Sequence, residues 1–270
     1  MSKTPGVLHP QQCNDHIKTF WRHLGECGRL LFTPDSRFTR LVVNHGRHAG
    51  FEGHPELMRL KQIADVSFPT LWANFRLVAF EGVHAGNERG EERVETALAL
   101  VLGDIHSSPP VVRIHSQCTT GDVFHSLRCD CGDQLHLAMR VIAGEGAGMI
   151  LYEHQEGRGI GLMEKLRAYE LQDQGLDTIE ANLRLGHAID LRDYLLPVQI
   201  LRFLNVRSVR LMTNNPEKID AVLSSGIVIV ERVSADVPGS PHSEHYVATK
   251  RERLGHLSNE GRMLPETAHL

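Results

Sequence analysis

The sequence predicts an α/β protein in which a mixed sheet is flanked by helices, with an extra segment at the N-terminus. Short apolar runs at 111–115 and 148–154 have the length and composition of buried strands. Between them, residues 135–148 carry apolar side chains at helical spacing and end in glycines, which indicates a helix and its C-terminus. Helices that alternate with apolar strands are typical of α/β sheet proteins.

The first 64 residues form an N-terminal extension of unknown role. Within it, the spacing of apolar and aromatic residues predicts a helix over 14–31. Residues 37–43 alternate like a short strand, and residues 56–64 predict a second helix. No residue pattern in this extension indicates a chemical function.

From Asp65 onward, short elements follow one another closely. Strands are expected at 69–82 (one or two), 95–104, 111–115 and 121–124. The elements expected next are a helix at 135–148, a strand at 148–154, a helix at 159–175, a helix, turn and strand over 200–215, a helix at 215–226 and a strand at 227–233. Asn215 and Pro216 suit the start of a helix, as Gly226 suits its end. Residues 235–243 predict a loop, and the polar residues after it are expected to be peripheral.

Composition and charge exclude several classes of protein. Hydrophobic residues make up 41% and charged residues 23%, which is ordinary for a soluble globular chain. A net charge of −4 provides no basic field, so we expect neither nucleic-acid nor membrane-surface binding. No run of 18 apolar residues and no secretory signal is found, so a cytoplasmic location is expected.

Three of the five cysteines, Cys118, Cys129 and Cys131, lie close together in the sequence. An odd number of cysteines without an export signal argues against disulfides, and thiolates at this spacing suit Zn²⁺. His115 or His125 would complete a closed structural site, whereas an open position would leave room for a reactive water. The spacing alone does not choose between the two. Zinc deaminase motifs are missing, which disfavours that class.

Two further segments are candidates for binding phosphate. Residues 156–161 (EGRGIG) lie between a predicted strand and a predicted helix, where glycines expose backbone N–H groups and Arg158 adds a charge. Residues 212–216 lie between a strand and a capped helix that carries Lys218 in its first turn. A plain glycine turn and ordinary helix capping explain these patterns equally well.

Asp190 and Arg192, two positions apart, project together if the segment is extended, although a surface ion pair is the ordinary interpretation of such a pattern. Tyr169 shares a helix face with Leu162 and Leu166, a spacing more common in a core than in a catalytic site.

Taken together, these stretches resemble the GTP cyclohydrolase II family. The matching segments occur in the family's order between about Phe68 and Leu257. They are RIHSQCTTGDVFHSLRCDCGDQL, YEHQEGRGIGLMEKLRAYELQDQG, DTIEANLRLGHAIDLRDY, RLMTNNPEKI, IVIVERV and SEHYVATKRERLGHL. The resemblance sets the expected layout: an extension over 1–64, a catalytic domain over 65–257 and a polar tail over 258–270.

The resemblance implies zinc-dependent hydrolytic opening of the imidazole ring of GTP at the start of riboflavin biosynthesis. The products are formate, pyrophosphate and 2,5-diamino-6-ribosylamino-4-pyrimidinone 5′-phosphate. It implies one zinc per subunit on Cys118, Cys129 and Cys131, Mg²⁺ with the triphosphate, and a homodimer. It assigns Asp190 as proton acceptor, Arg192 as nucleophile on the α-phosphorus, and Tyr169 to the active site.

The resemblance also implies which residues bind GTP. They are Arg113, Ile114, His115, Ser116, Gln117, Gln134, Glu156, Gly157, Arg158, Thr178, Thr213 and Lys218. Arginine has a pKa above about 12 and rarely offers a free lone pair, so charge stabilisation at the α-phosphate is the simpler role for Arg192.

One departure from the family pattern keeps an alternative open. Gln117 stands where the family usually has a glutamate, so a carboxylate beside the metal is lost. A divergent homologue would act on a related purine or pyrimidine nucleotide, for example in pyrimidine catabolism, or would stop at the formylamino intermediate. A non-catalytic nucleotide-binding protein is a third hypothesis, which the intact cysteines disfavour. The extension is too short for the dihydroxybutanone-phosphate synthase domain that some relatives carry.

Overall fold

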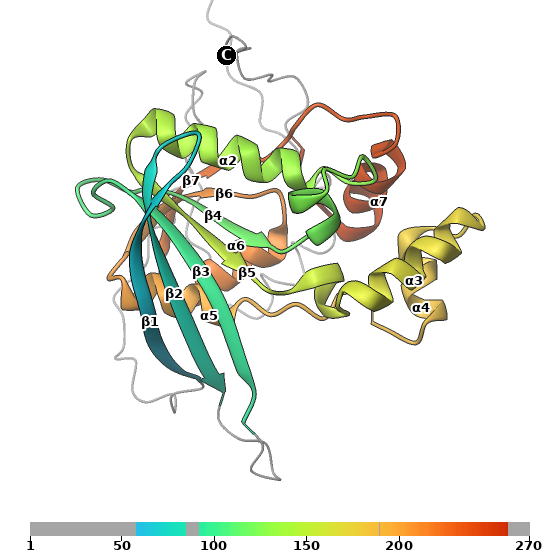
Figure 1. The fold of residues 1–270 in the computed structure, drawn as a ribbon, viewed down its shortest axis with the longest axis horizontal. Helices are drawn as coiled ribbons and strands as arrows, with labels where there is room; N and C mark the ends of the chain where they lie inside the picture. The colour runs from blue at the N-terminus through green and yellow to red at the C-terminus, as the bar shows by residue number, and fades with distance from the viewer. Residues whose placement is uncertain (1–57, 85–91, 189, 259–270) are drawn as a thin grey trace, which may run out of the picture. The chain divides into compact units, whose positions relative to one another are not determined.

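The computed structural model describes residues 58–84, 92–188 and 190–258. The helix predicted at 14–31 and the strand at 37–43 lie outside the described residues. A seven-stranded sheet runs through the described part in the order β1-β2-β3-β5-β4-β6-β7 (Figure 1). Its mixture of antiparallel and parallel pairs confirms the predicted mixed sheet.

One half of the sheet is antiparallel. It consists of β1 (Met58–Pro69), β2 (Asn74–His84) and β3 (Val94–Leu102), and β3 also pairs antiparallel with β5. The helix predicted at 56–64 is wrong for the described residues, because the chain is already in β1 at Met58. Pairing with β2 along the whole strand supplies the backbone hydrogen bonds, and this long-range pairing outweighs a short helical pattern.

The other half is parallel and contains β4 (Val111–Ser116), β5 (Gly148–Glu153), β6 (Ser208–Met212) and β7 (Val228–Val233). All four were predicted from their apolar runs. β4 and β5 are buried along nearly their whole length, and strands buried on both faces tend to show an apolar run that is easy to recognise.

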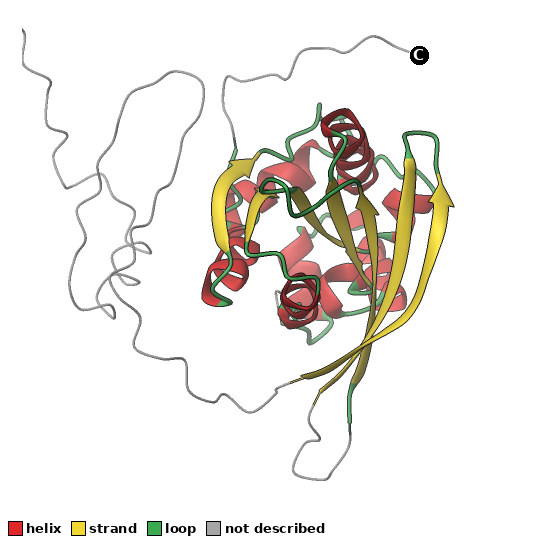
Figure 2. Ribbon diagram, turned by 90° about the vertical axis from the view of Figure 1, so that its left-hand side faces the viewer, coloured by secondary structure: helices red, strands yellow, loops and turns green. Residues whose placement is uncertain are grey.

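Helices cover both faces of the sheet (Figures 1 and 2). On one face α2 (Cys131–Glu145) contributes Ala138, Met139 and Ile142 to one apolar cluster. On the other face α5 (Leu195–Phe203) and α6 (Pro216–Ser224) pack into a second, larger cluster. The two clusters are the cores on either side of the strands.

Three further helices, α3 (Leu162–Asp173), α4 (Thr178–Arg184) and α7 (Glu244–Leu254), complete the described part. The strand predicted at 121–124 is wrong: the chain forms a π-helical turn over Thr119–Val123. The expectation that the residues after 243 are peripheral is also wrong for α7, whose Tyr246 and Lys250 line the central cavity. None of the described helices combines the length and the apolar character needed to cross a bilayer.

The topology places the site. β4, β5 and β6 are parallel, so the segments that follow Ser116, Glu153 and Met212 leave the sheet at one edge. In open α/β sheets this carboxyl edge is where ligands bind. The three segments carry the cysteines, the EGRGIG turn and the TNNP turn, respectively.

Candidate active site

The three cysteines singled out in the sequence come together beyond β4. The sulfur atoms of Cys118, Cys129 and Cys131 all lie within 4.8 Å of one another, and those of Cys118 and Cys129 are 3.6 Å apart. Cys118 and Cys129 are buried. Among the described residues, neither His115 nor His125 joins this group as a fourth ligand.

Gly121 lies against the sulfur cluster, where there is no room for a side chain. A Cβ atom on Gly121 would lie 3.0 Å from the sulfur of Cys129 and 3.2 Å from that of Cys118. These distances are tighter than ordinary van der Waals contacts, so a side chain at this position would push the sulfurs apart. The π-helical turn therefore brings bare backbone against the cluster.

The ionisation of the cysteines fits a bound cation. Hydrogen bonds from Cys129 and Cys131 lower the pKa of Cys118, and the ammonium of Lys165, 3.0 Å from its sulfur, acts in the same direction. The nearby Cys118 sulfur raises the pKa of Cys129 to about 11. Without a metal ion the protein therefore favours only one thiolate among the three cysteines. A bound divalent cation would stabilise all three thiolates together. A three-thiolate set that no histidine closes suits zinc with an open position.

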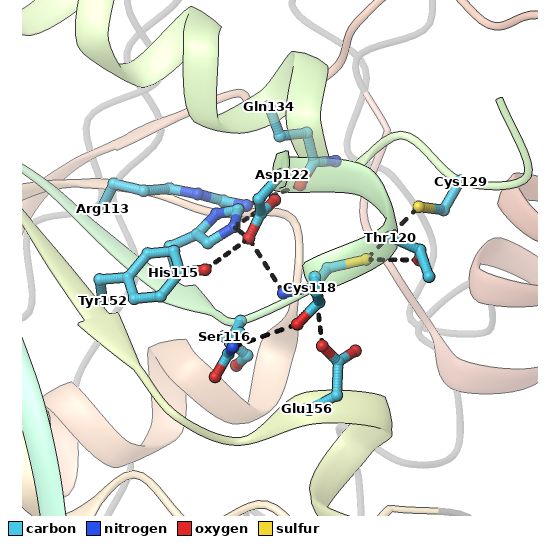
Figure 3. A network of polar contacts seen from close by, with 12 residues as sticks. Arg113, His115, Ser116, Cys118, Thr120, Asp122, Cys129, Gln134, Tyr152 and Glu156 are labelled. Atoms are coloured by element: carbon cyan, nitrogen blue, oxygen red, sulfur yellow. Dashed lines mark hydrogen bonds and ion pairs between the residues drawn. The ribbon is translucent and has the colours of Figure 1, made fainter. Parts of the chain in front are cut away.

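Asp122 holds the cysteine segment against the sheet (Figure 3). Its carboxylate accepts the backbone N–H of Cys118 at 2.9 Å and the hydroxyl of Tyr152 at 2.9 Å, and lies 3.2 Å from Nε2 of His115. The ring of His115 stacks on Tyr152, with 5.4 Å between centroids. His115 is therefore a support beneath the metal site and not a ligand of it.

Glu156 joins the second strand end to the cysteine segment (Figure 3). Its carboxylate accepts the backbone N–H of Thr119 at 2.6 Å and pairs with Lys165 Nζ at 2.7 Å. Lys165 also donates to Thr120, whose hydroxyl is 3.4 Å from that of Tyr169. Tyr169 lines the cavity, so the helix face it occupies is part of the site and not of the core.

Arg158 lies in a strained turn after β5. It has a φ of 61°, a left-handed conformation that is uncommon for residues other than glycine. Its two terminal guanidinium nitrogens are buried and have no hydrogen-bond partner within the described residues. A buried guanidinium with free donors at a cavity wall is suited to an anionic ligand, and strain of this kind is typical of functional sites.

Arg113 and Lys218 bring two more positive charges to the cavity. Nζ of Lys218 donates to the backbone oxygen of Ile114 at 2.9 Å, and Arg113 donates to Gln134 at 2.6 Å. Burial lowers the pKa of Lys218 well below its usual range, and repulsion from Arg113 and Arg192 adds to the effect. An anionic ligand would relieve this repulsion.

Asp190 and Arg192 form a buried ion pair and not a surface one. Their side chains are only 14% and 12% exposed. Asp190 accepts from the backbone N–H of Arg192 at 3.0 Å, from its Nε at 2.9 Å and from a terminal nitrogen. Arg192 lines the cavity, whereas Asp190 stands behind it. Burial opposes the charge of Arg192, but the hydrogen bonds to Asp190 prevail and raise its pKa above the usual range.

Gln117 lies on the cavity wall beside Cys118. Its amide nitrogen donates to the hydroxyl of Thr119 at 3.2 Å, and its amide oxygen is 3.0 Å from Nδ1 of His154. The side chain of Gln117 thus connects the cysteine segment to His154.

These segments enclose a cavity of about 1010 Å³, part of it open to solvent. All but two of the predicted site residues line it. The exceptions are Asp190 and Ile114, which lie behind the wall. Lining residues that the sequence patterns did not single out include Gln155, Lys165, Asn182, Tyr246, Lys250 and His256. The sequence could have predicted Lys165 as a site residue, because it lies one helical turn before Tyr169.

Comparison with known proteins agrees with this geometry. A family model described as GTP cyclohydrolase II matches residues 61–234. The chain is 50% identical over 204 residues to GTP cyclohydrolase-2 of Escherichia coli O9:H4 (strain HS), an alignment that covers 75% of this chain and 100% of that protein. The chain belongs to the GTP cyclohydrolase II family. GTP cyclohydrolase-2 of Shigella boydii serotype 18 (strain CDC 3083-94 / BS512) gives the same identity and coverage.

Among solved structures, a two-domain 3,4-dihydroxy-2-butanone 4-phosphate synthase from A. baumannii aligns at 19% identity with a TM-score of 0.36. That alignment covers 64% of this chain and 40% of the other, and is too distant to add to the GTP cyclohydrolase II assignment. The family match confirms the predicted fold. The predicted boundaries at 64 and 257, and the GTP contacts of individual residues, stay predictions.

Proposed function

We propose that this protein catalyses the GTP cyclohydrolase II reaction, in which hydrolysis opens the imidazole ring of GTP. C8 leaves as formate, and the β- and γ-phosphates leave as pyrophosphate. The product is 2,5-diamino-6-ribosylamino-4-pyrimidinone 5′-phosphate, which serves riboflavin biosynthesis. The observation that carries the proposal is the three-sulfur cluster open to a cavity whose wall includes the basic side chains of Arg113, Arg158, Arg192 and Lys218.

Cys118, Cys129 and Cys131 would hold the zinc ion. When bound there, zinc supplies the Lewis acidity that activates water at neutral pH. The residues around the sulfurs hold the purine ring against this position. Gln117, Lys165 and Tyr169 line the cavity beside the sulfurs, so the ring would lie among polar groups that replace bulk water.

The cationic side chains would bind the triphosphate. Arg158 and Lys218 carry donors toward the cavity that protein groups satisfy only in part. Charge that develops on the departing pyrophosphate is stabilised by such fixed cations, and Mg²⁺ carried by the triphosphate would share this role.

Arg192 acts at the α-phosphate as a stabilising charge. Its bonds to Asp190 hold the guanidinium in one orientation and raise its pKa, so a nucleophilic lone pair is less accessible than in a free arginine. Both oxygens of Asp190 are engaged by Arg192, which suits a positioning role better than that of proton acceptor. Tyr169, with its hydroxyl close to Thr120 at the cavity wall, is the better placed proton carrier.

The presence of glutamine at position 117 favours one alternative function. In this alternative the protein is a divergent enzyme that acts on a related nucleotide or stops at the formylamino intermediate. An uncharged amide beside the sulfurs removes a proton acceptor that a glutamate would provide. Gln117→Glu is therefore expected to raise GTP turnover. An unchanged rate would show that the amide is no handicap and would leave the alternative without its support.

The deciding experiment incubates the purified protein with GTP, Zn²⁺ and Mg²⁺, and measures formate and pyrophosphate separately. Formation of both supports the proposal, and formate alone or a formylamino product supports the shortened reaction. Cys129→Ser is the matched control, which we expect to retain no zinc and to produce neither product. Absence of both products from the zinc-loaded wild type would overturn the proposal, and other purine and pyrimidine nucleotides would then be screened.

We further propose a cytoplasmic homodimer, the assembly that the family resemblance implies. Sedimentation of the zinc-loaded protein tests the assembly.

A further inference from the structure

The C-terminal segment after β7 returns to the metal site. Ser240 donates to the backbone oxygen of Leu127 at 3.2 Å, and the backbone N–H of Leu257 donates to the oxygen of Asn214 at 2.8 Å. Between these two points lies α7, whose Tyr246 and Lys250 line the cavity. The segment thus runs from the cysteine loop to the turn after β6.

Of two ion pairs made by α7, the more buried joins it to Asp130, the residue between two predicted zinc ligands. Nζ of Lys250 donates to Oδ1 of Asp130 at 2.6 Å, and both side chains are largely buried. The ammonium of Lys250 also lies 4.5 Å from the ring centre of Tyr246. Because this pair is shielded from water, the attraction between its two charges is screened far less than in a surface ion pair.

The second oxygen of Asp130 continues the chain of contacts into the nucleotide cavity. Oδ2 accepts from Nε2 of Gln134 at 2.7 Å, and Oε1 of Gln134 accepts from Arg113 at 2.6 Å. The amide of Gln134 is therefore fixed in one orientation, with its nitrogen toward Asp130 and its oxygen toward Arg113. One carboxylate joins the metal loop, the guanidinium of Arg113 and α7.

We propose that Lys250 is a positioning residue, which through Asp130 holds the Cys129–Cys131 loop ready for zinc and through Gln134 orients Arg113 toward the nucleotide. This role rests on the proposed function only for the identity of the nucleotide. Neither the family resemblance nor the residue patterns singled out Lys250, since its partner Asp130 is 120 positions away in the sequence.

The test compares Lys250→Met with Lys250→Arg on the zinc-loaded protein. Zinc retention is measured by competition with a chromogenic chelator, and affinity by calorimetric titration with a non-hydrolysable GTP analogue. Outer-sphere partners of metal ligands are worth about 10–100-fold in metal affinity. We expect Lys250→Met to weaken zinc retention by that order and analogue affinity severalfold, and Lys250→Arg to recover most of both.

Arg251→Ala is the matched control, because Arg251 is the adjacent charge on α7 and is exposed. It should leave both measurements within about twofold of wild type, and circular dichroism should show all variants folded. The inference is overturned if Lys250→Met retains zinc as well as wild type. It is equally overturned if Arg251→Ala is as harmful, or if Lys250→Arg is no better than Lys250→Met.

A variant cycle separates positioning from direct contact with the nucleotide. Gln134→Ala cuts the connection from Asp130 to Arg113, so in that background Lys250→Met should lower zinc retention but have little further effect on analogue affinity. An undiminished effect on affinity would mean that Lys250 touches the nucleotide itself and would overturn the relay. The zinc measurement needs no nucleotide, so it tests Lys250 even if GTP is not the substrate.

Discussion

At the scale of single residues, two cations of the same cavity are held in different ways. Arg192 is paired with the carboxylate of Asp190, whereas the hydrogen bonds of Lys218 Nζ that the described residues show go to uncharged groups, the backbone oxygen of Ile114 and, at 3.5 Å, the hydroxyl of Ser116. The charge of Arg192 is therefore secured before any ligand arrives. The charge of Lys218 is suppressed by burial and by its cationic neighbours, and a bound anion would restore it.

This difference predicts proton uptake at Lys218. Binding of a non-hydrolysable GTP analogue should raise the lowered pKa of Lys218, so the complex takes up a proton and affinity falls as pH rises toward the usual lysine pKa of 10.5. Calorimetry at pH 8 in buffers of different ionisation enthalpy measures the uptake. Lys218→Met should remove it, and equal uptake by this variant would contradict the assignment.

Arg192 gives a second prediction. Arg192→Ala should lower pyrophosphate release by about 100–1000-fold, the usual cost of losing one stabilising donor, and Arg192→Lys should retain part of the rate. Formate and pyrophosphate are measured separately. Undisturbed pyrophosphate release in Arg192→Ala would contradict the role, and a trapped phosphoguanidinium adduct would show that Arg192 is a nucleophile instead.

At the scale of elements, α4 shows how capping places a site residue. Asp177 accepts from the backbone N–H groups of Ile179 at 2.7 Å and Glu180 at 2.8 Å, while Glu180 bonds back to the N–H of Asp177. This capping box starts the helix at Thr178, which lines the cavity. Arg253 of α7 also pairs with Asp177.

Asp177→Ala should therefore cost about 0.5–2 kcal/mol of unfolding free energy and weaken nucleotide binding through Thr178. Asp177→Asn keeps a good helix cap but removes the ion pair with Arg253. This exposed pair should contribute little to the free energy of unfolding. Urea unfolding measures both variants. Equal losses in the two would show that the ion pair, and not the cap, stabilises α4.

Which elements could be predicted depends on how local their signals are. The runs that became β4, β5 and β7 are continuous and apolar, and the Asn215–Pro216 start of α6 is confirmed because its capping is encoded within a few residues. β1 could not be predicted, since its partner is the whole of β2 and most of its side chains are exposed. The turn at 119–123 packs Gly121 against the sulfurs of Cys118 and Cys129, a contact that the residues of the turn alone do not reveal.

The same distinction applies to the site. The metal cluster could be predicted because its ligands lie between 118 and 131. The partners that hold it could not: Asp122 meets Tyr152, and Lys250 meets Asp130, only in the folded sheet. The family resemblance supplied residue assignments that local patterns left ambiguous, such as Asp190 and Arg192.

At the scale of the whole molecule, Glu153 connects the core to the site. It ends β5 with its side chain almost fully buried, and burial raises its pKa to about 8. In the unfolded chain the same carboxyl has the usual glutamate pKa of about 4.5. Between these values the folded protein holds the extra proton on Glu153, so the contribution of this carboxyl to stability is greatest at the acid end and falls as pH rises toward 8.

Thermal unfolding at several pH values between about 5 and 8 measures this effect. Glu153→Gln keeps a neutral side chain of the same size, so its unfolding midpoint should vary less with pH and should exceed that of the wild type at the alkaline end. Parallel pH profiles for the two proteins would show that Glu153 does not control the dependence.

The site is divided between the short cysteine loop after β4 and the segments that follow two later strands, β5 and β6, and this division has a consequence during synthesis. All three sulfurs leave the ribosome before Lys218 has been made, by several seconds at about 5–20 residues per second. The nascent chain thus exposes the three thiols before the cavity residues that follow β6 have been synthesised. Cellular zinc supply at the moment of translation would then influence how much of the newly made protein matures correctly.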